Sequence, residues 1–174
     1  AYGGLNYIQF NKDDSVFVEP LICSKDTKEY LNNNLMLFYT GVTRSTGEIL
    51  KDQKQNTSSK YEILTQMRDM TKNFKTIISG GKDLNSIGKL LDNAWKLKKQ
   101  MSSKISSGFI DKYYEKALHN GALGGKILGA GGSGFLPLYC GSHNRQKLNN
   151  ALNEHTYVPF KFEAHGSQII FVKQ

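Results

Sequence analysis

Apolar residues in the central part of the chain recur at intervals of three and four positions, the spacing of helices that bury one face. Three consecutive helices are therefore predicted. The first is ended by Gly80-Gly81, the second starts behind Asp83, and the third is capped by Ser107 and stopped by Gly121. The predicted core stripes comprise Tyr61, Leu64, Met67, Met70, Phe74, Ile77 and Ile78; Leu84, Ile87, Leu90, Leu91, Ala94, Leu97 and Met101, with Trp95 on the margin; and Ile110, Tyr113, Tyr114, Ala117 and Leu118.

Extended runs precede these helices. Residues 5–10 and 15–21 flank an Asn-Lys-Asp-Asp turn, a pattern that predicts a β-hairpin. A lone hairpin is marginally stable in water, so this one is expected to belong to a larger sheet. After a polar bridge over residues 25–34, the run LMLFY predicts a central strand that ends at Thr40-Gly41, and Thr43 is the expected cap of a following helix.

The C-terminal part alternates between strands and a short helix. The apolar run 135–140, FLPLYC, predicts a buried strand, and Ser142 is the expected cap of a helix after it. Two more strands are predicted over 157–162 and 168–172. Because Pro159 lacks an N–H group, the first of these is confined to a sheet edge or starts late.

This order of elements predicts an α+β fold of the ferredoxin-like type, an antiparallel sheet covered by helices. The chain has 174 residues and is 39% hydrophobic, which suffices for one ordinary core. It shows no membrane-length apolar run and no signal-peptide pattern, so a soluble, cytoplasmic protein is expected. Cys23 and Cys140 lie far apart without a C-x-x-C pattern, which indicates two free thiols and no metal site.

The net charge of +8, from 23 Lys and Arg against 15 acidic residues, favours anionic partners. Sugar phosphates, ATP and nucleic acid all qualify on charge alone. The lysines on the predicted helices are interpreted as solvated helix faces: Lys89, Lys96, Lys98, Lys99, Lys104, Lys112 and Lys116.

The stretch 121–139, GALGGKILGAGGSGFLPLY, has seven glycines in nineteen residues. Its densest part, 129–134, leaves the backbone uncovered, and glycines at positive φ let successive N–H groups form a concave anion site. Glycine also serves tight turns and close packing, and that alternative stays open. The P-loop pattern is not met because Lys126 precedes the dense glycines, and the dinucleotide fingerprint fails because the loop opens into a strand.

A second candidate anion site lies where the central strand meets the next helix. Thr40, Gly41 and Arg44 fall at a strand end and a helix N-terminus, where unpaired N–H groups and the helix dipole favour negative charge. Arg44 can hold a phosphate with two hydrogen bonds, or it can form a surface pair with Glu48.

The glycine-rich stretch resembles the third motif of the GHMP kinases, with Ser133 standing where glycine is commoner. The segments AYGGLNYIQF, LMLFYTGVTRSTGEILKDQ and VPFKFEAHGSQIIF are similar to the heptose 7-phosphate kinase branch of that superfamily. The positions that match the third motif are Gly121, Ala122, Gly125, Lys126, Gly129, Ala130, Gly131, Gly132 and Gly134.

The resemblance implies a GHMP kinase C-terminal domain over 25–174, preceded by a hairpin, 1–24, that remains from a missing N-terminal domain. It implies an ATP- and Mg²⁺-dependent kinase acting on the anomeric hydroxyl of D-glycero-D-manno-heptose 7-phosphate, in the synthesis of polysaccharide precursors. Most ligands of ATP and Mg²⁺, and the catalytic Asp, would lie in the missing domain. The chain alone is therefore expected to hold no catalytic residue and no metal ligand, and to be inactive.

The resemblance places the ATP or substrate phosphates against Lys126 and residues 129–134, and the sugar phosphate near Thr40, Gly41 and Arg44. Three alternatives remain: another small-molecule kinase of the superfamily, a regulatory module, and an RNA-binding module on a ferredoxin-like sheet. The chain has no K/R-G-F/Y-G/A-F signature, which argues against nucleic acid as a partner, and a homodimer stays open. Among the histidines only His165, in the last predicted turn, is singled out; the others are expected at the surface.

Overall fold

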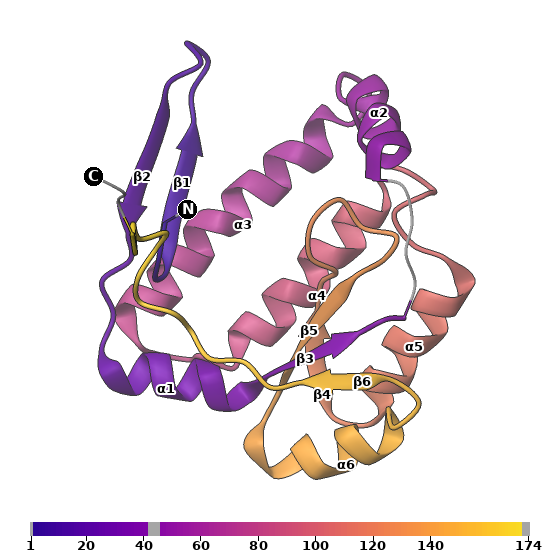
Figure 1. The fold of residues 1–174 in the computed structure, drawn as a ribbon. Coiled ribbons are helices and arrows are strands. Elements are labelled where there is room, and N and C mark those ends of the chain that lie inside the picture. Colours follow the sequence, from indigo (N-terminus) through magenta and orange to yellow (C-terminus); the bar gives the residue numbers. More distant parts are fainter. Residues whose placement is uncertain (1, 42–45, 172–174) are drawn as a thin grey trace.

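The computed structural model describes residues 2–41 and 46–171, which form an α+β domain and a separate hairpin (Figure 1). A four-stranded antiparallel sheet has the strand order β4-β5-β3-β6, and a two-stranded sheet pairs β1 with β2. The strands are β1 Asn6–Phe10, β2 Val16–Pro20, β3 Leu35–Tyr39, β4 Ala122–Gly125, β5 Phe135–Cys140 and β6 Thr156–Val158. The helices are α1 Lys25–Asn34, α2 Thr46–Asn56, α3 Tyr61–Gly80, α4 Ser86–Lys99, α5 Gly108–His119 and α6 Arg145–Ala151, with a 3₁₀ turn η1 at Ser142–Asn144.

The predicted α+β class, the hairpin and the three central helices are confirmed. Helix α3 ends at a glycine because Gly81 takes a left-handed conformation, φ 62°, and donates its N–H to Ile77 O. Helix α5 begins after Ser107, whose Oγ accepts a hydrogen bond from the N–H of Ile110. At the other end of α5, Gly121 has a φ of +99°, which ends the helix as predicted.

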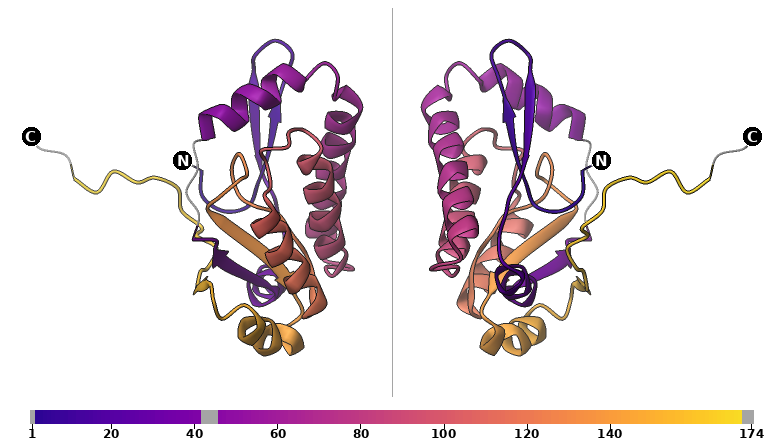
Figure 2. Two further views of the ribbon diagram at one scale, coloured as in Figure 1. Left: turned by 90° about the vertical axis from the view of Figure 1, so that its right-hand side faces the viewer. Right: turned by 90° about the vertical axis from the view of Figure 1, so that its left-hand side faces the viewer.

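The main core lies between the sheet and the helices α4 and α5, which pack on one face of the sheet (Figures 1 and 2). Helix α3 packs on α4 as a further layer. Tyr114 of α5 ties this core to the sheet: its hydroxyl donates to Asp92 Oδ1 of α4, 2.9 Å away, and accepts from the N–H of Gly125 in β4, 3.1 Å away. One hydroxyl therefore joins two helices and a strand.

Trp95 was expected at the margin of its helical stripe, and this prediction is wrong. Its side chain has no exposed surface, and its ring lies 6.3 Å from that of Tyr114. The expected surface position of His155 is also wrong, because its ring lies 4.0 Å from that of Tyr113. Trp95 is covered because α4 packs against α5, and His155 because the segment before β6 packs against α5. The spacing within one helix shows neither contact.

The predicted polar bridge over 25–34 is a helix, α1. Ser24 caps it, since its Oγ accepts a hydrogen bond from the N–H of Thr27 at 3.0 Å. Leu31 is the large apolar residue that α1 buries, in a second cluster with Ile78 and Tyr139. One large buried residue in ten positions gives too weak a periodicity to reveal a helix from sequence.

The C-terminal strand predicted over 168–172 is absent from its described part, 168–171, which is irregular and exposed. Strand β6 ends at Val158, before Pro159, and lies at the sheet edge as expected. After a contact in which Gly4 donates its N–H to Glu163 O, the chain extends away from the body of the molecule (Figure 2). Without a neighbouring strand, the β-forming residues there have no hydrogen-bonding partner.

Two expected helix caps have different outcomes. Ser142 begins η1, and no side-chain hydrogen bond caps either η1 or the α6 helix that follows. Thr43, the expected cap before α2, lies outside the described residues. Across the part of the chain that the structure describes, every helix is too short or too polar to cross a membrane.

Candidate functional site

The glycine-rich stretch, 121–139, has two parts with different structural roles. Its first part forms β4, a strand that the sequence did not predict, and its second part is a loop, 129–134, between β4 and β5. At Gly124 an added Cβ would lie 2.0 Å from Gly88 O, and at Gly125 it would lie 2.4 Å from Pro137 O. These two glycines therefore serve the close packing of β4 against α4 and β5.

The loop 129–134 mixes four glycines of positive φ with two residues that lack it. Ala130 and Ser133 do not have positive φ, so the serine at the position where the family motif favours glycine causes no strain. Conformations of opposite sign at neighbouring residues, as at Gly129 and Ala130, can turn successive N–H groups toward a common side. The four glycines with positive φ are Gly129 (70°), Gly131 (106°), Gly132 (76°) and Gly134 (96°).

Side chains from two helices hold the first half of the loop by its carbonyls. Lys98, in the last turn of α4, donates a hydrogen bond from Nζ to Gly129 O. Gln53 of α2 donates from Nε2 to Ala130 O, at 3.2 Å. Both carbonyls consequently point into the protein.

The second half of the loop is held by backbone contacts and one hydroxyl. Gly134 O accepts two hydrogen bonds from Thr40, one from its N–H and one from Oγ1, both at 2.9 Å. Gly132 donates its N–H to Ile105 O at 2.7 Å, and this is the loop amide that the protein itself uses. The antiparallel pairing of β3 with β5 explains the contact, because Tyr39 pairs with Phe135 directly beside the loop.

The remaining loop amides are free to bind a ligand. Within residues 2–41 and 46–171 no acceptor is in hydrogen-bond range of them, although the loop carbonyls are satisfied at three positions. Main-chain donors that converge without an internal acceptor suit an oxyanion such as phosphate. These amides belong to Gly129, Ala130, Ser133 and Gly134, which are exposed or partly exposed, and to Gly131, which is buried.

One buried lysine, Lys98, and one partly buried lysine, Lys126, make the base of the loop electropositive. Lys98 is 8% exposed, and burial together with the positive charge of Lys126 lowers its pKa to about 8. Burial also lowers the pKa of Lys126. Neither ammonium forms an ion pair with a carboxylate in the described part of the chain. An anion bound by the loop would therefore also neutralise charge that the protein leaves uncompensated.

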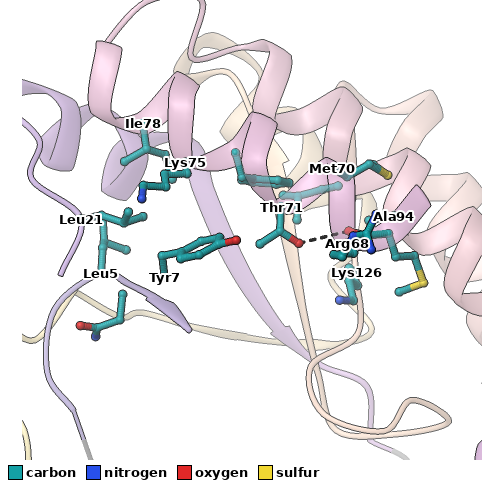
Figure 3. A pocket seen from close by; sticks show the side chains of 14 residues that line it. Leu5, Tyr7, Leu21, Arg68, Met70, Thr71, Lys75, Ile78, Ala94 and Lys126 are labelled. Carbon is teal, nitrogen blue, oxygen red and sulfur yellow. Dashed lines mark hydrogen bonds between the residues drawn. The ribbon is translucent and has the colours of Figure 1, made fainter. Parts of the chain in front are cut away.

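A cavity of about 510 Å³ lies beside Lys126, between the hairpin and helices α3 and α4 (Figure 3). Figure 3 shows Lys126 on the opposite side of this cavity from Leu5 and Leu21. Lys75 of α3 forms an ion pair with Glu19 of β2 at 2.6 Å and thereby joins the hairpin to the helix. The walls are mostly apolar and include Met67, Met70, Phe74, Ile78, Leu91 and Ala94.

The structure brings the two predicted anion sites together in part. Thr40 is buried, 1% exposed, and its hydroxyl proton is used by the glycine-rich loop. Gly41 is exposed, with a φ of +70° that favours glycine. Arg44 lies outside the described residues. Strand pairing thus places the end of β3 and the loop side by side, although about 90 residues separate them in the sequence.

The donor set around the loop fits phosphate and does not fit Mg²⁺. Mg²⁺ takes carboxylate and water oxygens in octahedral geometry, whereas the loop and its two lysines offer N–H donors and positive charge. The described residues contain no cluster of three His, Cys, Asp or Glu side chains that could hold a metal ion.

Sequence reasoning missed three residues of the site: Lys98, Gln53 and Ile105. Lys98 was assigned to a solvated helix face, and this assignment is wrong. A signal was present, because Leu91, Ala94 and Lys98 are three and four positions apart and therefore share one face of α4. A lysine on an apolar stripe departs from the pattern of a solvated face.

The fold and the loop define an α+β domain whose glycine-rich loop leaves main-chain donors unpaired within the described residues, next to the charges of Lys98 and Lys126. A family model described as the C terminal of GHMP kinases matches residues 57–156, and the chain belongs to this family.

The chain is also similar to individual kinases. It is 26% identical over 171 residues to D-glycero-alpha-D-manno-heptose 7-phosphate kinase of Campylobacter jejuni, a match over 95% of this chain and 50% of that protein. A crystal structure of a D-glycero-D-manno-heptose 1-phosphate kinase from Bacteroides thetaiotaomicron superposes with a TM-score of 0.67 at 23% identity, over 95% of this chain and 44% of the other. L. major mevalonate kinase, in complex with R-mevalonate, gives 0.69 at 19% identity, over 88% and 45%. The chain spans about half the length of these relatives.

Proposed function

We propose that this chain supplies one wall of the catalytic cleft of an ATP-dependent sugar-phosphate kinase. Its substrate in this proposal is D-glycero-D-manno-heptose 7-phosphate, which receives the γ-phosphoryl group of ATP on its anomeric hydroxyl, with ADP as the leaving group. The observation that carries the proposal is the set of free amides in the loop 129–134 above the uncompensated charges of Lys98 and Lys126. Membership of the GHMP kinases and the similarity to a heptose 7-phosphate kinase support the substrate class.

The residues of this chain would act by binding and by electrostatics. The free amides of the loop would hold phosphate oxygens with donors that are already in place, so little reorganisation is needed as charge moves during transfer. Lys126, beside the cavity, would add a point charge. Thr40 would hold the loop through Gly134 O, and Gly41 and Arg44 would contact the sugar phosphate.

The deprotonation of the attacking hydroxyl is assigned to a part of the kinase outside this chain. No described carboxylate pairs with Lys98 or Lys126, and the described residues offer no cluster of three possible metal ligands, so the base and the Mg²⁺ ligands would come from the remaining half. The hairpin, 1–24, is proposed to complete a sheet of that half, and β1 and β2 pair only with each other within the described chain. The 174-residue chain would then be inactive by itself.

The RNA-binding alternative gains no support from the aromatic residues of the sheet. Stacking of bases needs aromatic rings that are open to solvent on the sheet face. Phe38 and Tyr139 are fully buried, and the one exposed ring of β5, Phe135 at 40%, already lies against Tyr39 at a centroid distance of 5.3 Å.

The substrate is tested by ADP release from an intact kinase that contains this chain, with heptose 7-phosphate, heptose 1-phosphate, mevalonate and galactose offered in parallel. We expect the largest kcat/KM for heptose 7-phosphate, and an Arg44→Ala variant with a higher KM for it. Preference for another of these acceptors would overturn the substrate assignment, and an unchanged KM would remove Arg44 from the site.

The expected inactivity of the chain alone needs its own control. The 174 residues and a Gly131→Ala variant would be assayed under the same conditions. ATP turnover by the unaltered chain above that of the variant would contradict the proposal that catalysis requires another half.

A further inference from the structure

Lys98 combines three properties that are rarely found together in a lysine. It lies in the last turn of α4, on the face where Leu91 and Ala94 line the cavity. It is almost fully buried, and its ammonium donates to Gly129 O. No described carboxylate compensates its charge, and the charge that acts on it most strongly is the like charge of Lys126.

Burying an ammonium group without a counter-charge weakens a fold, because desolvation penalises the charged form. A hydrogen bond to a neutral carbonyl offsets only part of that penalty. The position of Lys98 therefore calls for an explanation beyond packing, and its hydrogen bond to the loop provides one.

A trans peptide group points its C=O and its N–H in opposite directions. The described chain has no cis peptide bonds, so the carbonyl of Gly129 and the N–H of Ala130 are oriented in this way. Lys98 holds the carbonyl of Gly129 toward the protein, and the N–H of Ala130 must then face away from it. Gln53 does the same for the next peptide group, between Ala130 and Gly131.

We propose that Lys98 is a positioning residue for phosphate binding, which fixes the Gly129–Ala130 peptide plane so that the N–H of Ala130 faces the bound anion. The inference rests on the proposed function, since it takes the loop 129–134 as the phosphate site. Lys98 differs from Lys126, which adds positive charge without a side-chain hydrogen bond to the loop. The two lysines therefore provide a matched pair of substitutions that separates orientation from charge.

The experiment compares the 174-residue chain with its Lys98→Met, Lys98→Arg and Lys126→Met variants. Amide ¹⁵N–¹H spectra of residues 129–134 are recorded without ligand, and the chain is then titrated with inorganic tripolyphosphate at two salt concentrations. In Lys98→Met we expect shifted and broadened resonances for Ala130 and Gly131 before any ligand is added, and an affinity about tenfold lower than that of the unaltered chain.

The control variants should respond differently. Lys126→Met should leave the ligand-free loop resonances in place and lower the affinity less, by an amount that shrinks at high salt. Lys98→Arg keeps the charge and the donors, so it should restore part of the loop signal and of the affinity. If Lys98→Met does not fold, Lys98→Arg tests the proposal in its place. The proposal is then supported if Lys98→Arg displaces the ligand-free loop resonances further than Lys126→Met does.

Two results would overturn the role of Lys98. One is a Lys98→Met variant with unchanged Ala130 and Gly131 resonances. The other is a pair of variants, Lys98→Met and Lys126→Met, that change the loop resonances and the affinity equally, because the loss of positive charge would then explain both. Failure of the unaltered chain to shift any loop amide with tripolyphosphate would instead count against the phosphate site of the proposed function. The ligand-free spectra would still decide whether Lys98 orients the loop.

Discussion

Two groups of glycines, only a few residues apart, do different work in this protein. An added Cβ at Gly124 or Gly125 would collide with backbone oxygen atoms at 2.0 and 2.4 Å, so these positions need glycine for lack of space. At Gly129 and Gly134 an added Cβ would meet nothing within 4 Å, and the requirement there is a positive φ. A single glycine-rich motif thus contains a packing contact and the proposed phosphate loop, and substitutions can tell the two apart.

The largest effect is expected at the packing glycines. Gly124→Ala would push a methyl group into Gly88 O, a backbone atom that cannot move without displacing α4. The free energy of unfolding should fall by about 3 kcal/mol or more, in the range of overpacked cores. Urea denaturation followed by circular dichroism measures it. A loss no greater than that of Gly129→Ala would show that the two groups of glycines are not distinct.

The next largest effect is expected from the buried ammonium of Lys98, which should make the free energy of unfolding depend on pH. The pKa of Lys98 is about 8 in the folded chain and 10.5 when it is not perturbed, so the unfolded chain binds more protons between these values. Stability should therefore rise as pH increases from about 8 to 10.5, by at most about 1.4 kcal/mol per pH unit. The measurement is the free energy of unfolding of the unaltered chain minus that of Lys98→Met, taken at each pH. The contributions of the other titrating groups cancel in this difference. Parallel pH profiles of the two proteins would contradict the buried charge.

The loop glycines should respond less than the packing glycines. Gly129→Ala places a Cβ in open space but at a φ of +70°, which costs an L-residue about 1 kcal/mol. Gly129→Asn should cost less because asparagine tolerates this conformation. Thermal melts of both variants test this order, and an alanine variant as stable as the parent would remove the conformational requirement.

The smallest effect is expected at Ser133, the loop residue that departs from the family motif. Since its φ is not positive, Ser133→Gly relieves no strain and adds only the entropy of a more flexible unfolded chain. Stability should change by less than about 1 kcal/mol, and tripolyphosphate affinity should stay within about twofold. A clear gain in affinity would indicate that the serine side chain obstructs the ligand.

Most of the fold could be predicted because its signals are local. The stripe that ends at Gly81 and the cap at Ser107 depend only on neighbours in the sequence, and the structure confirms both. The predicted strand over 168–172 failed in its described part because a strand also needs a partner, which a local pattern does not supply. Strand β4 was missed because Gly124 and Gly125 are poor strand formers that are required there by packing.

Only the main-chain part of the candidate site, the loop itself, could be predicted from the sequence, and the side chains that support the loop could not. The loop 129–134 was found from its glycines, and the structure leaves most of its amides free. Its supports come from α2, α4 and the segment before α5, and their residues carry no shared motif. Gln53 and Lys98 are ordinary polar residues until tertiary structure brings them within hydrogen-bond distance of the loop.

The hydroxyl of Tyr114 has a mechanical consequence for the glycine-rich loop. Because it holds Asp92 of α4 and Gly125 of β4 at once, the helix that carries Lys98 and the strand that leads into the loop cannot separate without breaking its bonds. Helix α4, strand β4 and the loop that follows should therefore move as one rigid unit. If the proposed kinase closes around a bound nucleotide, the movement would then have to come from its other half, because the surface formed by this chain stays still.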